Sequence, residues 1–222
     1  MRISARMLTP IAALLALSVV LGVGAQTRAR SQAAAPKPVA NPATAEPDKS
    51  AGSRTAPITV EVWSDFQCPA CRNLYGESIR PMMNDYVYSG KVYYIHRDMP
   101  LAMHAHARDA ARYANAAAQI DKFEKVAEAL YLNQDAWAAD GSRLEAVVAS
   151  ALTPAEMNKV RQAWKSPSVE AAIDKDIRRG SLFRVQSTPT VVLTHRGRTT
   201  PLPGGVNYAL LRRVLDQMLA EQ

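Results

Sequence analysis

The feature that most constrains the fold of this chain is a predicted strand-to-helix junction that holds its only two cysteines. Apolar and polar residues alternate over 58–62, which is typical of a half-buried strand, and the pattern ends near residue 64. Cys68 follows, and Pro69 suits the first turn of a helix because its missing N–H leaves no hydrogen bond unmade there. Cys71 then lies about one turn along that helix. A strand that leads directly into a helix indicates an α/β fold.

Further strands are predicted on both sides of a long helical section. Residues 91–96 and 190–194 are rich in β-branched and aromatic side chains, and a turn leads from the second of these to a strand over 198–202. The element order is therefore strand, helix, strand, helical block, strand, strand and helix. This order predicts an α/β layout with a helical insertion.

The helical section, about residues 102–180, has apolar residues at i, i+3, i+4 and i+7 in several stretches, which is typical of helices packed on a core. Ser142 with Glu145, and Thr153 with Glu156, have the spacing of capping boxes and predict two helix starts. We assign no chemistry to this section. An apolar stripe near the end of the chain predicts a closing helix, with Leu211, Val214, Leu215 and Met218 on one face.

The first 55 residues indicate an export signal and a spacer. Two arginines precede an apolar run over 11–23, and small residues follow, which predicts a secretory signal over 1–25 with cleavage after Ala25. An uncleaved membrane anchor is the alternative, although the run is shorter than the about 20 residues that span a bilayer. Residues 26–55 are rich in Ala and Pro and predict a flexible linker. We therefore expect one domain over 56–222 in an exported, periplasmic location, where cysteines can form disulfides.

Charge argues against a nucleic-acid partner. The whole chain has a formal net charge of +7, but residues 56–222 hold 20 basic and 18 acidic residues, a net charge of +2. Most of the basic excess therefore belongs to the predicted signal and linker. A basic binding surface on the folded domain is not expected to be its main purpose.

The cysteine pair carries the predicted chemistry. A helix N-terminus favours negative charge, so the thiolate of Cys68 is stabilised there and attacks, while Cys71 resolves the mixed disulfide that forms at Cys68. A structural disulfide is an alternative, but so short a loop removes little entropy from the unfolded chain. A metal site is the other alternative, and it would need two further ligands. Those ligands would come from His96, His104, His106 and His195.

Three motifs in order resemble the DsbA-like branch of the thioredoxin superfamily. They are WSDFQCPAC at residues 63–71, HRDMPL at 96–101 and TPT at 188–190. The resemblance covers about residues 56–222 and is close to the exported subgroup with the pattern SDFQCPxC. It implies a thioredoxin-like fold with the helical block inserted as a lid domain.

By this resemblance Pro189 is a cis-proline that faces the cysteine pair, whereas taken alone it would be an ordinary proline at a strand edge. The backbone of Thr188 would then pair with an extended substrate as an added strand, and its hydroxyl would tune the Cys68 thiolate. Pro69 and Ala70, between the cysteines, are the other residues expected to tune the pair or contact substrate. The resemblance implies no cofactor and no metal.

Two positions depart from the family pattern. Many relatives carry an acid six positions before the first cysteine, where it assists proton transfer at the buried sulfur, and this chain has Val62 there. Glu61 is one step away and, by strand alternation, points to the opposite face, so water, Asp65 or another group would serve Cys71. Strongly oxidising relatives have His between the cysteines, whereas Ala70 donates no hydrogen bond. This difference predicts milder oxidising power.

Together these observations predict an exported thiol–disulfide oxidoreductase that introduces disulfides into secreted polypeptides through Cys68 and Cys71. The resemblance implies two partners, reduced secreted polypeptides and a membrane quinone-linked protein that reoxidises the pair; residues 1–25 would supply any membrane tether. A periplasmic reductase or isomerase is the alternative with the same chemistry, because direction depends on the reduction potential. A non-catalytic, peptide-binding chaperone module is the alternative of a different class.

Overall fold

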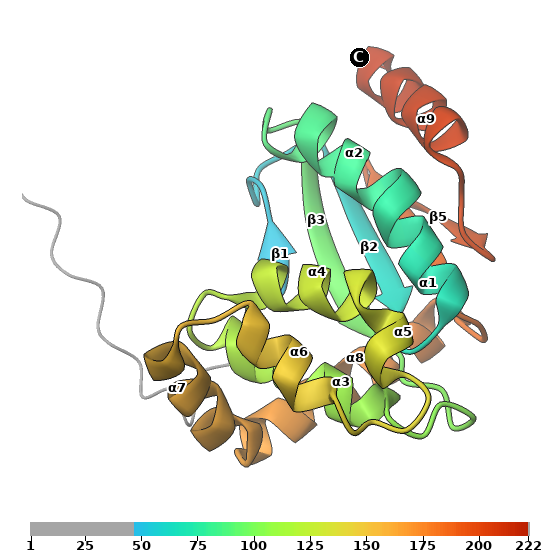
Figure 1. Ribbon diagram of the computed structural model, residues 1–222. Helices are drawn as coiled ribbons and strands as arrows, with labels where there is room; N and C mark the ends of the chain where they lie inside the picture. The colour runs from blue at the N-terminus through green and yellow to red at the C-terminus, as the bar shows by residue number, and fades with distance from the viewer. Residues whose placement is uncertain (1–46, 222) are drawn as a thin grey trace, which may run out of the picture. The chain divides into compact units, whose positions relative to one another are not determined.

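The computed structural model describes residues 47–221 (Figure 1). The predicted signal or anchor over 1–25 lies outside the described residues, as do residues 26–46 of the predicted linker. Within the described range, no helix combines the length and the apolar character needed to span a membrane. The chain forms a mixed sheet with helices on its faces, which is the α/β layout that the element order predicts.

Five strands form one sheet in the order β1-β3-β2-β4-β5. β2 and β3 are parallel, and the other neighbouring pairs are antiparallel. β2 is the central strand and is buried along most of its length, so the cysteine pair that follows it starts from a fixed point in the fold. The strands are β1 (Ser50–Ala51), β2 (Ile58–Ser64), β3 (Val92–Asp98), β4 (Thr190–His195) and β5 (Arg198–Pro203).

One bent helix over 69–87 follows β2, six helices lie between β3 and β4 as the predicted insertion, and α9 closes the chain. Pro81 lies inside the bent helix, where it has no N–H to bond to the preceding turn, and a π-helical turn lies just before it. The segments of the bent helix are α1 (Pro69–Leu74), η1 (Tyr75–Ile79), α2 (Arg80–Met82) and η2 (Met83–Val87). The others are α3 (Ala107–Ala118), α4 (Phe123–Leu132), α5 (Gln134–Trp137), α6 (Leu144–Ser150), α7 (Pro154–Trp164), α8 (Pro167–Leu182) and α9 (Tyr208–Ala220).

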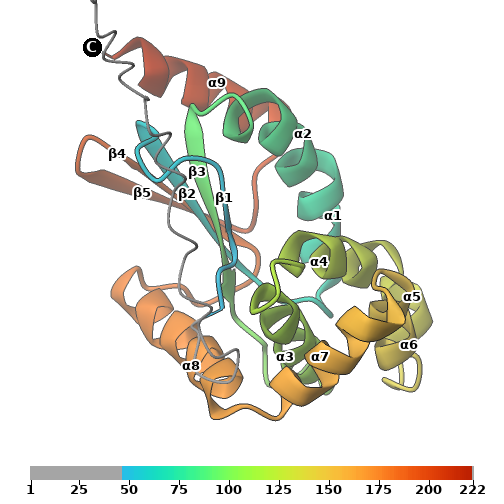
Figure 2. The ribbon, with the colours of Figure 1, turned by 90° about the vertical axis from the view of Figure 1, so that its left-hand side faces the viewer.

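The two faces of the sheet are covered by different helices: α1, α2 and α9 lie on one side and α8 on the other (Figure 2). Val60 and Val62 of β2 pack in the main core, whereas Trp63 belongs to a second, smaller core. Trp63 is fully buried, and its indole N–H donates to the carbonyl of Asp176 on α8 at 3.0 Å. Because successive side chains of β2 point to opposite faces of the sheet, this strand contacts the main core on one face and α8 on the other.

Residues 47–55, which the sequence placed in the flexible linker, belong to the fold, so the predicted boundary at residue 55 is wrong for this stretch. β1 pairs with β3 at the edge of the sheet, and Lys49 is 6% exposed, between the carboxylates of Asp98 and Asp176. A strand of two residues has no periodicity to detect, and lysine is rarely buried unless it is paired. For these two reasons the sequence gives no sign of β1.

One of the two predicted capping boxes is present. The Thr153 hydroxyl accepts the N–H of Glu156 at 3.3 Å, and the Glu156 carboxylate accepts the N–H of Thr153 at 2.8 Å. The box predicted at Ser142 and Glu145 is wrong, because α6 begins without a side-chain cap. There the Glu145 carboxylate instead accepts from Arg161 at 2.8 Å, which draws it away from the helix start.

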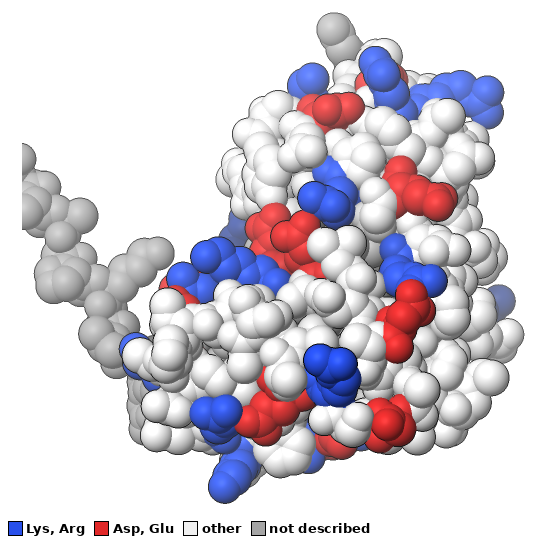
Figure 3. All heavy atoms as spheres, viewed as in Figure 1, with Lys and Arg blue, Asp and Glu red and all other residues white. Residues whose placement is uncertain are grey.

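Acidic and basic side chains are interspersed on the face drawn in Figure 3. This pattern fits the near-neutral charge of residues 56–222, which hold 20 basic and 18 acidic residues. That face therefore presents no large field of one sign to a nucleic acid.

Candidate active site

Cys68 and Cys71 lie at the predicted junction, where β2 passes into α1. Cys68 is the last residue before α1, with extended backbone (φ −75°, ψ 122°), and Pro69 lies in the first turn. The N–H groups of Cys71 and Arg72 both donate to the Cys68 carbonyl at 3.1 Å. Both cysteines are free thiols; Cys68 is 7% exposed and Cys71 1%. A reagent in solvent therefore meets Cys68 first.

The pKa values of the two thiols move in opposite directions. Hydrogen bonding from the Cys71 thiol is the main cause that lowers the pKa of Cys68 to about 5, with smaller contributions from the Thr188 side chain and from backbone N–H groups. Burial raises the pKa of Cys71, and its hydrogen bond to Cys68 raises it further. At neutral pH the pair is therefore a thiolate at Cys68 and a thiol at Cys71, which suits an attacking and a resolving sulfur.

Thr188 and Pro189 lie against Cys68. The Thr188–Pro189 peptide bond is cis, as the resemblance implies, and the Thr188 carbonyl lies 3.8 Å from Cys68 Sγ. The Thr188 hydroxyl is buried and has no hydrogen-bond partner among the residues that the structure describes. It is therefore available to donate to the Cys68 thiolate, consistent with its contribution to the low pKa.

An open groove lies beside the cysteine pair and includes Ala70 and Pro189 among its lining residues. The N–H of Gly204 donates to the Pro189 carbonyl at 3.0 Å. Gly205 has φ +85°, and a Cβ at this position would lie 3.2 Å from the Pro189 ring. Glycine therefore allows the chain after β5 to pass close to Pro189. The remaining lining residues are Leu74, Glu77, Ser78, Val206 and Asn207.

The carboxylate of Asp65 organises the loops around the site. It is fully buried, and it accepts from the N–H of Gln67 at 2.7 Å and from the N–H of Leu101 at 2.8 Å. His104 Nδ1 lies 2.7 Å from the same carboxylate. Asp65 thus ties the turn before Cys68 to the loop after β3, a role that the sequence did not reveal although Asp65 stands in the first motif.

Two glutamines fix the same turn to the helical insertion. Gln134 of α5 is 2% exposed and donates to the carbonyls of Phe66 at 2.7 Å and Cys68 at 3.1 Å. Gln67 donates to the carbonyl of Ala138 at 2.6 Å, and its own side-chain oxygen accepts a backbone N–H at 2.7 Å. Gln134 is a buried polar residue that no motif in the sequence signals. The insertion therefore holds the backbone on which Cys68 sits.

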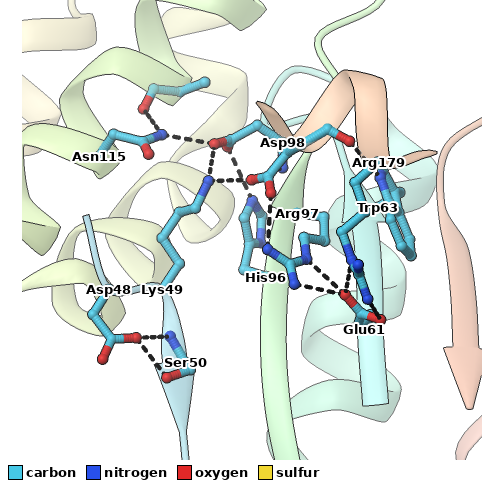
Figure 4. Close-up of polar contacts among 12 residues, drawn as sticks. Asp48, Lys49, Ser50, Glu61, Trp63, His96, Arg97, Asp98, Asn115 and Arg179 are labelled. Atoms are coloured by element: carbon cyan, nitrogen blue, oxygen red, sulfur yellow. Dashed lines mark hydrogen bonds and ion pairs between the residues drawn. The ribbon is translucent and has the colours of Figure 1, made fainter. Parts of the chain in front are cut away.

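Glu61 lies away from the cysteines, as strand alternation predicts. Its carboxylate accepts from Arg97 at 2.8 Å and from Arg179 at 2.7 and 2.8 Å (Figure 4). Burial alone would raise the pKa of Glu61, but these two guanidinium groups outweigh burial and lower it. Glu61 is therefore an ionised member of a charge network on the α8 side of the sheet.

The histidines considered as metal ligands are dispersed. His96 is buried and stacks on Phe66, with ring centroids 4.9 Å apart, and His104 is paired with Asp65. Over residues 47–221, no group of three or more His, Cys, Asp or Glu side chains is arranged to hold a metal ion. The geometry thus gives the metal alternative no support.

A thioredoxin-like sheet, a low-pKa cysteine at a helix start and a cis-proline beside it together define the class of thiol–disulfide oxidoreductases. The chain belongs to the thioredoxin family, since the family model described as Thioredoxin matches residues 44–214.

Solved structures place the fold among the DsbA proteins. The chain matches Wolbachia pipientis alpha-DsbA1 with a TM-score of 0.65 and 18% identity, covering 77% of this chain and 90% of that one. It matches oxidised Bacillus subtilis BdbD with a TM-score of 0.65 and 18% identity, covering 78% and 92%. For Pseudomonas aeruginosa DsbA2 the TM-score is 0.61, with 24% identity over 79% and 95%. The helical insertion is thus part of a known fold.

Curated relatives share somewhat higher identity with the chain, and one of them is much longer. A probable disulfide bond formation protein D of Bacillus cereus is 25% identical over 152 residues, covering 64% of this chain and 68% of that protein. A Na(+)/H(+) antiporter, NhaA 3 of Salinispora tropica, is 30% identical over 156 residues, which are 68% of this chain. The chain spans only 22% of the length of that antiporter.

Proposed function

We propose that the protein is an exported thiol–disulfide oxidoreductase that introduces disulfides into secreted polypeptides through Cys68 and Cys71. The observation that carries the proposal is the opposite shift of the two thiol pKa values at one helix start. A thiolate at Cys68 stabilises the reduced protein, and a stabilised reduced form makes the disulfide a stronger oxidant. The low pKa of Cys68 therefore supports the proposal of disulfide donation over reduction.

The proposed cycle starts from the Cys68–Cys71 disulfide. A substrate thiolate attacks Cys68 Sγ, the S–S bond breaks, and its electron pair leaves on Cys71 Sγ. A second substrate thiolate then attacks the substrate sulfur of the mixed disulfide and releases Cys68 as a thiolate. The substrate gains one disulfide, and the protein leaves as a dithiol that has taken up two electrons.

The proposed substrate site is the groove beside Ala70 and Pro189, together with the backbone of the half-buried Thr188. The groove is open, and its lining residues come from α1 and η1, from Pro189 and from the segment after β5. An extended polypeptide pairing with the chain at Thr188 would bring its own cysteine to Cys68. A membrane quinone-linked protein is proposed as the partner that reoxidises the dithiol, and residues 1–25 as the export signal or tether.

The deciding experiment is the equilibrium reduction potential of the Cys68–Cys71 pair. The purified protein is titrated against glutathione, and the two redox forms are counted by mass after thiol trapping. We expect a value toward about −120 mV, typical of oxidising dithiols, and short of that extreme because Ala70 donates no hydrogen bond. A value near about −270 mV, typical of reductants, would replace the proposal with a reductase.

Variants of the two cysteines test the mechanism itself. Cys68→Ser should abolish oxidation of a reduced test protein. Cys71→Ser, first converted by oxidised glutathione into a Cys68–glutathione disulfide, should trap the test protein on Cys68 with release of glutathione, because no second protein sulfur can displace it. Peptide binding that survives loss of both cysteines, combined with no thiol exchange by the unmodified protein, would instead indicate a chaperone module.

A further inference from the structure

Cys71 lies in a pocket where charge is costly. It is 1% exposed, and burial is the largest cause that raises its pKa. Each time the Cys68–Cys71 disulfide opens, the electron pair of the broken bond leaves on Cys71 Sγ. The protein must therefore supply hydrogen-bond donors to that sulfur, because an unpaired buried charge is strongly disfavoured.

Two donors face Cys71 from the end of β2. The N–H of Asp65 lies 3.4 Å from Cys71 Sγ. Ser64 directly precedes Asp65 at this strand end, and the interaction of its side chain with Cys71 lowers the pKa that burial raises. Ser64 is itself buried, at 4% exposed. Its hydroxyl therefore exchanges no proton with bulk water directly and depends on its own buried neighbour.

That neighbour is Tyr131 of α4. The hydroxyls of Ser64 and Tyr131 are 2.6 Å apart, and Tyr131 is 1% exposed. Its ring is held between those of Phe66 and Tyr75, with centroids 4.9 and 4.7 Å away. Burial, and then the nearby charge of Cys71, raise the pKa of Tyr131 well above its usual value, so the phenol keeps its proton. Either hydroxyl of this pair can donate, so the protonated phenol of Tyr131 is able to donate to Ser64 Oγ when Ser64 gives its own proton to another acceptor.

The carboxylates near the site are committed to other partners. That of Asp65 accepts from two backbone N–H groups and pairs with His104. That of Glu61 lies on the opposite face of the sheet and is held by Arg97 and Arg179 (Figure 4). Neither carboxylate has a hydrogen bond to Cys71 in the part of the chain that the structure describes. The hydroxyls of Ser64 and Tyr131 are therefore the side-chain groups placed to stabilise negative charge on Cys71 Sγ.

We propose that Tyr131 and Ser64 form a hydrogen-bond chain that stabilises the Cys71 thiolate during disulfide opening. Tyr131 donates to Ser64 Oγ, and Ser64 donates to Cys71 Sγ, so each bond polarises the next. Ser64 touches a reacting atom and is a catalytic residue, whereas Tyr131 acts through Ser64 and is a positioning residue. The inference rests on the proposed function and assigns the group that serves the resolving sulfur.

The test measures how fast the disulfide opens. Oxidised full-length protein is mixed with dithiothreitol, samples are quenched with acid, and free thiols are trapped and counted by mass at several pH values between 6 and 8. One dithiothreitol thiolate attacks Cys68, Cys71 leaves, and the second dithiothreitol thiol closes its own ring and frees Cys68, so sulfur and electrons balance. The variants are Ser64→Ala, Tyr131→Phe and the two together.

A hydrogen bond to a charged group contributes enough that Ser64→Ala should slow opening about tenfold or more at every pH. Tyr131→Phe keeps the stacked ring and should slow opening several-fold. The double variant should be no slower than Ser64→Ala alone, because Tyr131 acts only through Ser64. Tyr75→Phe is the matched control: it removes a hydroxyl from the ring stacked on Tyr131 and should leave the rate unchanged.

Additive losses in the double variant, or a Tyr131→Phe rate equal to that of the unmodified protein, would overturn the chain. An equally slow opening of the disulfide in Tyr75→Phe would also overturn the chain, since the rate would then respond to any change in the stacked rings and not to the Tyr131 hydroxyl. Thermal unfolding of each variant in its oxidised form separates slow opening from misfolding. The proposed function fails by a different result, namely oxidase activity that survives in Cys68→Ser, so the two failures are distinguishable.

Discussion

Among single residues, the position of each thiol decides its role, since Cys68 and Cys71 are identical side chains three positions apart. Cys68 lies at the helix start, where backbone N–H groups and the Cys71 thiol converge on its sulfur. Cys71 lies inside the first turn and is 1% exposed. One residue type thus provides both a stable thiolate and a protonated partner, because hydrogen bonding outweighs burial at one sulfur only.

The first prediction concerns Thr188 and the pH dependence of Cys68. The rate at which iodoacetamide alkylates Cys68 in the reduced protein should be half-maximal near pH 5, since the pKa of Cys68 is about 5. Thr188→Val removes a hydroxyl that lowers this pKa, so the midpoint should move to higher pH. Thr190→Val is the matched control, because the Thr190 hydroxyl donates to the Ser187 carbonyl at 2.8 Å. An equal shift in both variants would contradict a specific role for Thr188.

How far the sequence predicted the site depends on how local each contact is. Cys68 and Pro69 are neighbours in a strand-to-helix pattern, so the attacking sulfur could be assigned from spacing alone. Gln134 and Tyr131 lie sixty or more residues from the cysteines along the chain. They belong to helices whose apolar spacing looks the same as that of any other helix packed on a core. Their hydrogen bonds exist only once the insertion has docked, so no periodicity could indicate them.

Among the elements, packing of α8 on the sheet depends on one glycine. A Cβ at Gly180 would lie 2.8 Å from Nε1 and 3.2 Å from Cδ1 of the Trp63 ring. That indole is fully buried and also bonds to α8, so it has little freedom to move. Trp63 and α8 therefore approach as closely as the absence of a side chain allows.

The second prediction follows from this contact. Gly180→Ala should lower the free energy of unfolding by about 1–3 kcal/mol through overpacking, measured by urea denaturation. Gly76→Ala is the matched control, because Gly76 also lies in a helix and a Cβ there would meet nothing within 4 Å. The control should be neutral or stabilising by up to about 1 kcal/mol. Equal stabilities for the two variants would show that α8 can shift to accept a methyl group.

The third prediction separates the two helix starts that share the spacing of a capping box. Thr153→Ala should cost about 1 kcal/mol in urea denaturation, because Thr153 caps α7 with its side chain. Ser142→Ala should change stability by less than about 0.5 kcal/mol, because α6 has no side-chain cap. A similar loss in both variants would mean that Ser142 caps α6 in solution. The pair tests whether spacing or geometry defines a cap.

At the level of the whole molecule, a buried charge network joins parts of the chain that sequence analysis treated separately. Lys49 precedes β1, Asp98 ends β3 and Asp176 lies on α8, and the lysine pairs with both carboxylates (Figure 4). Asp176 also accepts from Arg97 at 3.0 Å. β1 is thus held at the sheet edge by charge as well as by its short ladder. The element order was predictable from periodicity, but this connection required the fold.

The fourth prediction removes the lysine. Lys49→Met leaves the buried carboxylate of Asp98 without its lysine partner and that of Asp176 with Arg97 alone, and should lower the free energy of unfolding by about 3–5 kcal/mol at pH 7. Lys159→Met, at an exposed position, is the control and should change it by less than about 0.5 kcal/mol. Urea denaturation of both variants measures the two losses. A loss at Lys49 no larger than that at Lys159 would mean that β1 contributes little to the fold.

The pH dependence of that loss tests whether charge is its cause. Burial acts to raise the pKa of Asp98, but Lys49 and other partners outweigh it and hold the pKa well below its usual value. A carboxyl whose pKa is lowered on folding stabilises the protein above its unfolded pKa of about 3.9, and that stability is lost as pH falls through the folded value. In Lys49→Met the Asp98 carboxylate has lost its lysine partner, so protonating it removes a poorly compensated buried charge. The difference in free energy of unfolding between the unmodified protein and Lys49→Met should therefore become smaller as pH falls from 5 to 3. A difference that stays constant over this range would assign the loss of stability to packing of the lysine side chain.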